Sequence, residues 1–474
     1  RGINEGEINV TGTSSIGFAL IKGGNSNNSG KITVGNKAED SIGFYGKEDN
    51  FANSGTIQVT SSKDKNKAIV LDGTNPTNKI NFTNTGNVYV NTADNSNTNL
   101  IGTGNIGVYA QGNYKFDHNS GTVKAGTNAI AFYVKDATGQ VNIKAPIVLS
   151  NSGTGANAGT TIGIYSDGNA QVQFGQNSKL TIGEGAVGLY SANPANFNNT
   201  FKIETGKTLN VELGKNSTFG LLNGNKNITA SPLLSKYLNN GTTDKINITS
   251  FGEGASIFYA TLKATAILDT DYTVTNGDAD STSVIVANDG ANVEIASGKT
   301  LTTNTNVGLI ATGGARVSAA VPVAENKGAL ISTRADKGIG IYVTYGTGKN
   351  SGTITMSNQN AVGMLATIGS NLTNSKKIEL NGVSSAGIYG ENSDMTNLGA
   401  NSEIIVNKEA SAGMYSKLTS ASTVDKNSKN EGKIKINADR AGKSAAMYSK
   451  VESGTKKLNT ENTGTIEVAQ KASA

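Results

Sequence analysis

The feature that most constrains this chain is a short pattern that recurs along its length. One signature, Asn-x-Gly-x-(Ile/Val)-x-apolar, occurs at 4–10, 28–34, 53–59, 84–90, 119–125, 350–356, 430–436 and 462–468. A second, apolar-Gly-apolar-Tyr, occurs at 42–45, 106–109, 162–165, 187–190, 339–342, 386–389 and 412–415. A unit this short cannot bury a core alone, so the repeat predicts a stack in which neighbouring copies cover one another.

The tyrosine position and its aliphatic substitutes give the period. One column runs through Leu20, Tyr45, Leu71, Tyr109, Tyr133, Tyr165, Tyr190, Leu222, Tyr259, Val286, Ile310, Tyr342, Leu365, Tyr389, Tyr415 and Tyr448. These sixteen copies span 428 residues, and their fifteen intervals average 28.5 residues. A period between about 20 and 50 residues is typical of solenoids, propellers and arrays.

The residues inside each copy select among these architectures. Ile32 and Val34 share one face of a strand while Lys31 and Thr33 share the other, which is the period of two that β-strands show. Gly, Asn, Asp and Ser separate the strands, as expected for tight turns. We therefore predict an all-β fold, a right-handed parallel β-helix of about sixteen coils. Two or three strands per coil are both compatible with the pattern, and short loop or helical insertions are expected.

Two columns of side chains are expected to run along the stack. Asn28, Asn53, Asn84, Asn119 and Asn350 recur just before the turn glycine, and their amides are predicted to form ladders between coils.

In the second signature, Ile42 and Phe44 are predicted to point inward and Gly43 and Tyr45 outward. The tyrosine column would then either shield the backbone at glycines or present rings on which sugars stack.

The chain is expected to be one continuous solenoid, with parts at 1–222 and 246–474 and an insertion at 223–245. Residues 91–104 and 150–160 are polar and glycine-rich, which indicates surface loops. Ser231-Pro232 followed by LLSKYLNN predicts an N-cap, a proline at the first helical position and about two helical turns. This short helix could be a protruding anchor for a receptor or a cover folded over the solenoid. The candidate ligand-binding residues are Leu233, Leu234, Lys236, Tyr237, Leu238 and Asn239.

Few residues in the sequence indicate catalysis, metal binding or nucleic-acid binding. The chain has no cysteine, which excludes disulfides and thiolate metal sites, and its charges are scattered, 41 basic against 36 acidic, without a nucleic-acid-binding stripe. The one histidine, His118, is expected in an exposed turn, with the adjacent Asp117 pointing the other way. The acidic stretch at 269–280 is expected to be a solvated turn, with weak calcium binding as the alternative. We predict no enzyme activity, no metal and no cofactor.

The recurring N-S-G-x-I-x-V and S-x-G-I-Y-(G/S) units, together with VIVANDGANVEIASGKTLTTNTNVGLIATG at 284–313, closely resemble the passenger regions of fusobacterial type V autotransporter adhesins. The resemblance covers essentially the whole chain, which begins and ends in mid-pattern, so we expect a segment of a longer protein. It implies a signal peptide upstream, a C-terminal β-barrel translocator downstream and display on the bacterial outer membrane.

Members of that family attach bacteria to host cells and to other bacteria, through galactose-type glycans or immunoglobulin-like receptors on immune cells. The resemblance therefore implies a surface-displayed adhesin segment. A second hypothesis is a stalk that presents a distal binding tip and contacts nothing itself. A third is a carbohydrate-active enzyme, for which no recurring column of acidic residues is present.

Overall fold

The computed structural model describes residues 2–22, 24–48, 50–74, 79–92, 103–135, 138–153, 159–168, 170–192, 200–224, 234, 245–314, 321–438 and 444–469. The elements assigned among them are strands β1 to β49, and neighbouring strands in each sheet run parallel. The chain divides into two compact units. Unit 1 comprises Arg1–Asn223 and Lys236–Ala255, and unit 2 comprises Gly224–Ser235 and Ser256–Ala474.

Unit 1 has three parallel sheets, and the strands of each sheet neighbour one another in chain order. The first sheet contains β1 (Ile3–Asn4), β4 (Ser26–Asn28), β7 (Asn50–Asn53), β10 (Ile80–Asn84), β13 (Tyr114–His118), β16 (Gln140–Ile143), β19 (Gln171–Phe174) and β22 (Phe201–Ile203). The second contains β2 (Glu7–Val10), β5 (Lys31–Val34), β8 (Thr56–Val59), β11 (Asn87–Val90), β14 (Val123–Ala125), β17 (Pro146–Leu149), β20 (Lys179–Ile182), β23 (Thr208–Leu213) and β25 (Lys245–Phe251). The third contains β3 (Ile16–Leu20), β6 (Ile42–Gly46), β9 (Lys67–Gly73), β12 (Asn105–Gly112), β15 (Ala129–Lys135), β18 (Ile162–Asp167), β21 (Val187–Ser191) and β24 (Thr218–Asn223).

Unit 2 repeats this arrangement. Its first sheet contains β27 (Thr265–Leu268), β30 (Asn292–Ile295), β33 (Val323–Asn326), β36 (Thr347–Asn350), β39 (Asn371–Asn374), β42 (Asp394–Asn397), β45 (Lys426–Asn430) and β48 (Leu458–Asn462). Its second contains β28 (Tyr272–Val274), β31 (Thr300–Thr303), β34 (Ala329–Ser332), β37 (Thr353–Met356), β40 (Lys377–Leu380), β43 (Glu403–Val406), β46 (Lys433–Ile436) and β49 (Thr465–Val468). Its third contains β26 (Ser256–Thr261), β29 (Ser283–Asn288), β32 (Val307–Thr312), β35 (Ile339–Thr344), β38 (Val362–Thr367), β41 (Ala386–Glu391), β44 (Ala412–Leu418) and β47 (Ala445–Val451).

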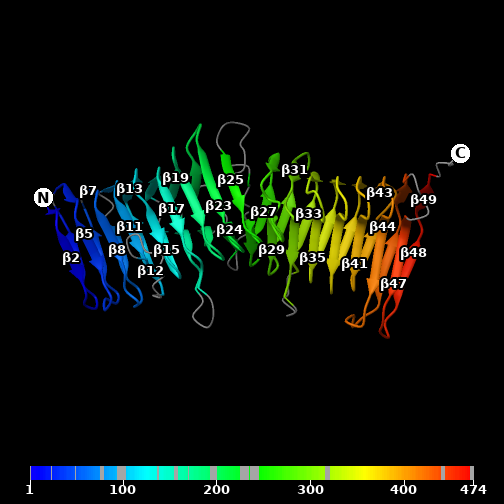
Figure 1. Cartoon of the computed structure of the whole chain (residues 1–474), viewed down its shortest axis with the longest axis horizontal. Helices are drawn as coiled ribbons and strands as arrows, with labels where there is room; N and C mark the ends of the chain where they lie inside the picture. Colours follow the sequence, from blue (N-terminus) through cyan, green and yellow to red (C-terminus); the bar gives the residue numbers. More distant parts are fainter. Residues whose placement is uncertain are drawn as a thin grey trace. The chain divides into compact units, whose positions relative to one another are not determined.

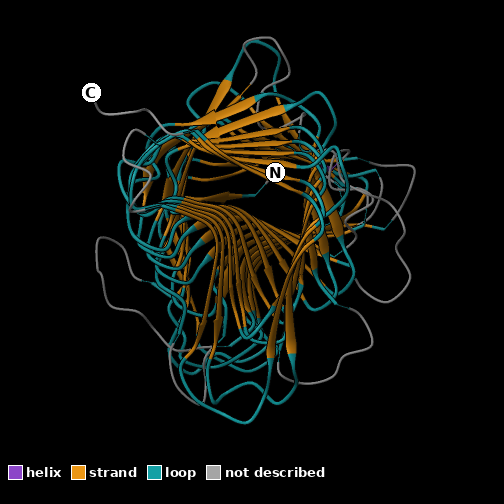
Figure 2. Cartoon of the chain, turned by 90° about the vertical axis from the view of Figure 1, so that its right-hand side faces the viewer, coloured by secondary structure: helices purple, strands orange, loops and turns teal. Residues whose placement is uncertain are grey.

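A complete coil therefore has three strands, one for each sheet, and the next complete coil adds one strand to each sheet. β4, β5 and β6 form one such coil, and β7, β8 and β9 form the next. Figure 1 shows the strands of successive coils side by side, and Figure 2 shows the strands as walls with turns at the corners. The predicted parallel β-helix is confirmed, and the number of strands per coil, left open by the sequence, is three.

The core of each unit is built from columns of like residues. In unit 1, Ile32, Ile57, Val88 and Val123 are partners in successive strands and are fully buried. In unit 2, the corresponding column contains Ile354, Ile378, Ile404 and Ile434. Because each side chain is covered by its copies above and below, a chain with only 36% hydrophobic residues can still form a continuous core.

Unit 1 adds an aromatic column to this core. The rings of Phe44 and Phe51 stack with centroids 3.8 Å apart, and Phe82 and Phe116 stack at 4.9 Å. Phe51 and Phe82, at 4.8 Å, join the two pairs into one row. Stacked rings bury a large apolar area and favour one alignment of the coils.

Candidate functional site

A ladder of buried amides crosses the first sheet of unit 1. Asn4 donates to Asn28 at 2.7 Å, Asn28 donates to Asn53 at 2.7 Å, and Asn53 donates to Asn84 at 2.7 Å, each from Nδ2 to Oδ1. Asn28, Asn53 and Asn84 are fully buried. Each of these three amides both donates and accepts within the ladder, so its hydrogen bonds are made inside the fold. The ladder that the sequence predicted for these three residues is confirmed.

The ladder continues into His118 instead of the predicted Asn119. Asn84 Nδ2 donates to His118 Nδ1 at 3.0 Å, and His118 Nε2–H donates to the Pro146 carbonyl at 3.3 Å. The side chain is fully buried, so the predicted exposed turn histidine is wrong. Its strand register with Asn84 points it inward, and burial lowers its pKa to about 4, which keeps the ring neutral.

His118 therefore has a structural role. Asp117 lies on the outer side of the strand, as predicted, where it contacts Lys115 at 2.8 Å and accepts from Asn142 at 2.6 Å. The contacts of His118 are thus an amide and a carbonyl, neither of which is the nucleophile that a catalytic base needs.

Unit 2 has a second buried ladder. Asn326, Asn350, Asn374, Asn397 and Asn430 form it, and each of the first four donates to the next at 2.7–2.8 Å. Asn430 then donates to Asn462 at 2.6 Å. The prediction for Asn350 is confirmed.

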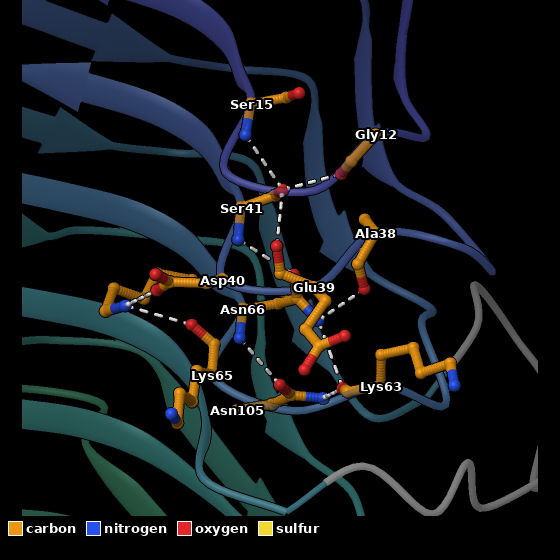
Figure 3. A network of polar contacts seen from close by, with 11 residues as sticks. Gly12, Ser15, Ala38, Glu39, Asp40, Ser41, Lys63, Lys65, Asn66 and Asn105 are labelled. Atoms are coloured by element: carbon orange, nitrogen blue, oxygen red, sulfur yellow. Dashed lines mark hydrogen bonds and ion pairs between the residues drawn. The ribbon is translucent and has the colours of Figure 1, made fainter.

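A further polar network holds the turns that precede the third sheet of unit 1. The Ser41 hydroxyl accepts from the Ser15 backbone and donates to the Gly12 carbonyl, while the Ser41 backbone donates to Asn66 (Figure 3). The Asn66 backbone in turn donates to the side chain of Asn105 at 2.8 Å. These buried polar side chains bond to the neighbouring coils and leave little capacity for a ligand.

The tyrosine column lies on the outer face of the third sheet. Tyr45 is half-buried, but Gly43 faces the interior, where an added Cβ would lie 3.3 Å from Ile57 and 3.4 Å from Ile32. The predicted orientations of Ile42 and Gly43 are therefore wrong: pairing skips Gly43, so Ile42 lies on the outer, half-exposed side.

The strand register also corrects three members of the predicted tyrosine column. Ala19, Val70 and Leu221 occupy the column in place of Leu20, Leu71 and Leu222.

Most tyrosines form continuous stacks. In unit 1, Tyr133 and Tyr165 stack at 4.8 Å, as do Tyr165 and Tyr190. In unit 2, Tyr389 and Tyr415 stack at 4.9 Å with an angle of 11°, and Tyr415 and Tyr448 stack at 4.9 Å. Neighbouring rings cover both faces of Tyr415 and of Tyr165, so these tyrosines present ring edges and hydroxyl groups to solvent. A sugar cannot stack on their faces.

A groove lies beside the stack of unit 2. It has a volume of about 520 Å³ and is lined by Val362, Ser384, Ser385, Ala386, Tyr389, Ala410, Ser411, Ala412, Tyr415, Ala445 and Tyr448. Its cause is a run of three alanines. Ala386, Ala412 and Ala445 are partners in successive strands, three residues before the three tyrosines.

Many other coils carry branched side chains at the same strand position, although Ser256 and Ser283 also occupy it. The column holds Ile106, Ile130 and Ile162 beside the tyrosine stack of unit 1, and Val307 and Ile339 in unit 2. Branched side chains occupy the outer surface there, whereas a methyl group leaves it open. The groove therefore coincides with three consecutive coils that carry alanine at this position. The signal in the sequence is Ala three residues before the signature tyrosine, at 386, 412 and 445.

Charged residues lie next to this tyrosine stack, outside the lining of the groove. Tyr389 donates to Glu391 at 3.5 Å, and burial, followed by the charge of Glu391, raises the pKa of the phenol. Lys417 contacts both Glu391 and Glu452 at 3.3 Å, and Lys450 contacts Glu452 at 2.8 Å. The lining of the groove thus combines alanine methyl groups, serines and tyrosine rings.

The predicted binding residues of the insertion fall largely outside the described residues. This applies to Leu233, Lys236, Tyr237, Leu238 and Asn239, and to the predicted helix that carries them. Leu234 is described and is fully buried, and its backbone N–H donates to the Ile267 carbonyl in β27 at 2.9 Å. This one member covers part of unit 2 and does not protrude.

The acidic stretch at 269–280 is partly structural. Asp271 accepts from the Thr300 backbone at 2.8 Å, and Asp280 forms an ion pair of 3.0 Å with Arg334. Arg334 also donates to the carbonyls of Asp278 and Ala279. No cluster of three or more metal-ligating side chains occurs within the described part of the chain.

No protein-family model, curated protein or solved structure matches this chain. Among the described residues, no helix has the length and apolar character needed to cross a membrane.

Proposed function

We propose that this chain is a non-enzymatic adhesin segment displayed on the bacterial surface, and that the groove beside Tyr389, Tyr415 and Tyr448 is a contact site for a host protein receptor. The three alanines at 386, 412 and 445 carry the proposal, because they open a groove where the repeat would fill one. Anchoring to the outer membrane through a translocator, and contact with other bacterial cells, belong to the same proposal on the strength of the family resemblance.

The groove favours a receptor segment over a glycan. Aromatic sugar-binding sites use an uncovered ring face, whereas Tyr415 is covered by rings on both sides. Tyrosine edges and alanine methyl groups instead suit the apolar side chains of an extended protein segment, and tyrosine is common among the residues that dominate such interfaces. The alternating charges of Glu391, Lys417 and Glu452 supply a polar rim.

The test is binding of the purified monomer to immunoglobulin-like receptor ectodomains, with a glycan array in parallel. Ala412→Ile should lower receptor affinity at least tenfold, because isoleucine already occupies this strand position at Ile162 and Ile339 and would fill the groove without changing the fold. Val307→Ile is the matched control, since it enlarges a side chain in the same column outside the groove. It should bind as the parent does.

Two results would count against the proposal. Receptor binding that survives Ala412→Ile would place the contact elsewhere. A folded monomer that binds no receptor and no glycan would favour the alternative function, a stalk that presents a distal tip.

A further inference from the structure

A second, polar hollow lies on the outer face of the first sheet of unit 1. It has a volume of about 220 Å³ and is lined by Lys115, Gln140, Asn142, Lys144, Gln173, Gly175 and Glu204. The residues come from successive coils, because β13, β16 and β19 are neighbours in register. At ~30 Å³ per water molecule the hollow holds about seven waters, which is space for one sugar ring.

Gly175 creates the hollow. Lys144, Gly175 and Glu204 each follow a strand of this sheet, and their N–H groups bond to His118, Ile143 and Phe174 of the preceding coil. Gly175 has no left-handed backbone conformation that would require glycine. A Cβ at this position would instead lie 2.6 Å from Glu204 Oε2 and 3.0 Å from Lys144 Cγ. The missing side chain is therefore a feature of the surface and not of the turn.

The polar groups of the hollow divide into two sets. Lys115 and Asn142 are both engaged by Asp117, and Gln140 donates to Asn142 at 3.2 Å. The other set is Lys144 and Glu204, which flank Gly175 from opposite sides. Among the described residues, neither takes part in an ion pair within 4.0 Å. The hollow thus has an ammonium group and a carboxylate that face each other across Gly175 without forming a direct ion pair.

We propose that this hollow binds a carboxylated sugar residue of an acidic glycan. The Lys144 ammonium group would pair with the sugar carboxylate, while Glu204 and the amides of Gln140 and Gln173 would bond to ring hydroxyls. A neutral sugar leaves Lys144 without an anion. A free phosphate or sulfate ion would leave the Glu204 carboxylate without a hydroxyl donor, whereas the ring hydroxyls of a sugar supply one.

This site lies in unit 1 and shares no residue with the tyrosine groove of unit 2. The inference extends the proposed adhesive role to a second class of ligand. It does not depend on the receptor groove, so either proposal can fail while the other stands.

The experiment is saturation-transfer NMR on the whole chain, with glucuronate, glucose and N-acetylneuraminate as probes. We expect saturable, millimolar binding of a carboxylated sugar and at least tenfold weaker binding of glucose. Lys144→Gln should remove this preference, and Gly175→Thr should abolish binding by filling the hollow. Lys124→Gln is the control, because it removes one ammonium group from the outer side of β14, away from the hollow.

Three outcomes would overturn the assignment. Equal binding of glucuronate and glucose would show that the carboxylate is not recognised. Unchanged binding in both Lys144→Gln and Gly175→Thr would locate the sugar elsewhere. Absence of binding of every probe would leave the hollow without this ligand, and the receptor assay on Ala412→Ile would remain unaffected.

Discussion

The amide ladder of unit 1 allows a quantitative test of what holds the coils together. Asn53→Ala removes two hydrogen bonds of 2.7 Å, one from Asn28 and one to Asn84. Asn28 Nδ2 retains the Gly30 carbonyl at 3.3 Å, and the Gly55 carbonyl retains the Asn87 N–H at 2.9 Å. Within the described contacts, Asn84 Oδ1 keeps no donor.

The magnitude follows from these losses. Two buried hydrogen bonds contribute ~1 kcal/mol each and one orphaned buried acceptor costs ~1–3 kcal/mol, so Asn53→Ala should lower the free energy of unfolding by at least about 3 kcal/mol. Asn81→Ala is the matched control. It removes an amide–amide bond of 2.8 Å to Asn50 in the same pair of strands, but Asn81 is exposed, so water replaces its partner. The expected cost of the control is below ~0.5 kcal/mol.

The assay is amide hydrogen exchange together with urea unfolding followed by far-UV circular dichroism, because the chain has no tryptophan. In a solenoid, stability is a sum of coil and nearest-neighbour terms, so the loss should be local. At ~1.4 kcal/mol per tenfold, exchange in β4, β7 and β10 should accelerate about 100-fold while the sheets of unit 2 are unaffected. Equal and small effects of Asn53→Ala and Asn81→Ala would refute the claim that burial makes the ladder stabilising.

Two further perturbations test other contacts of unit 1. His118 has a pKa of about 4 in the folded chain and about 6.5 in the unfolded chain. As the pH falls from 6.5 to 4, only the unfolded chain gains a proton at this residue, so the free energy of unfolding should fall by about 3 kcal/mol. His118→Asn should remove this slope in pH-dependent urea unfolding, and a persistent slope would assign it to carboxyl groups. Gly55→Ala should destabilise its coil by more than ~2 kcal/mol, since a Cβ there would clash with the Gly30 carbonyl. Gly6→Ala, at the same motif position with open space around it, should be near neutral in thermal unfolding, and similar effects of the two would contradict the stacking argument.

The strand pattern predicted the architecture because it is set by local chemistry that recurs. Residues that alternate as Ile32 and Thr33 do give a strand one buried face, and turn-forming residues end the strand. Because the unit repeats, neighbouring copies can stack and cover that face. The buried amides were predictable for a similar reason. An Asn that returns at one place before each turn glycine meets copies of itself in the neighbouring coils.

The errors arose where the spacing between copies changes. His118-Asn119-Ser120-Gly121 has one residue more than Asn84-Thr85-Gly86, and the strand register places His118 opposite Asn84. The Asn-x-Gly motif instead aligns Asn119 with Asn84. At Gly43 the alternation itself fails, because pairing skips this residue and two consecutive positions face inward. Neither shift can be derived from residue types, since both depend on how the adjacent coil is aligned.

The same reasoning explains why the candidate sites are exceptions to the repeat. A side chain that recurs in each coil is satisfied by its own copies: Asn53 by Asn28 and Asn84, and Tyr415 by the rings of two neighbours. Such a column has little remaining capacity to bind anything else. Capacity appears where a column is interrupted, as at Ala412 and at Gly175, because the missing atoms leave a space that no neighbouring coil fills. In a solenoid of this kind, ligand contacts should therefore be sought where the repeat is broken, and the residues that define the repeat should tolerate substitution least.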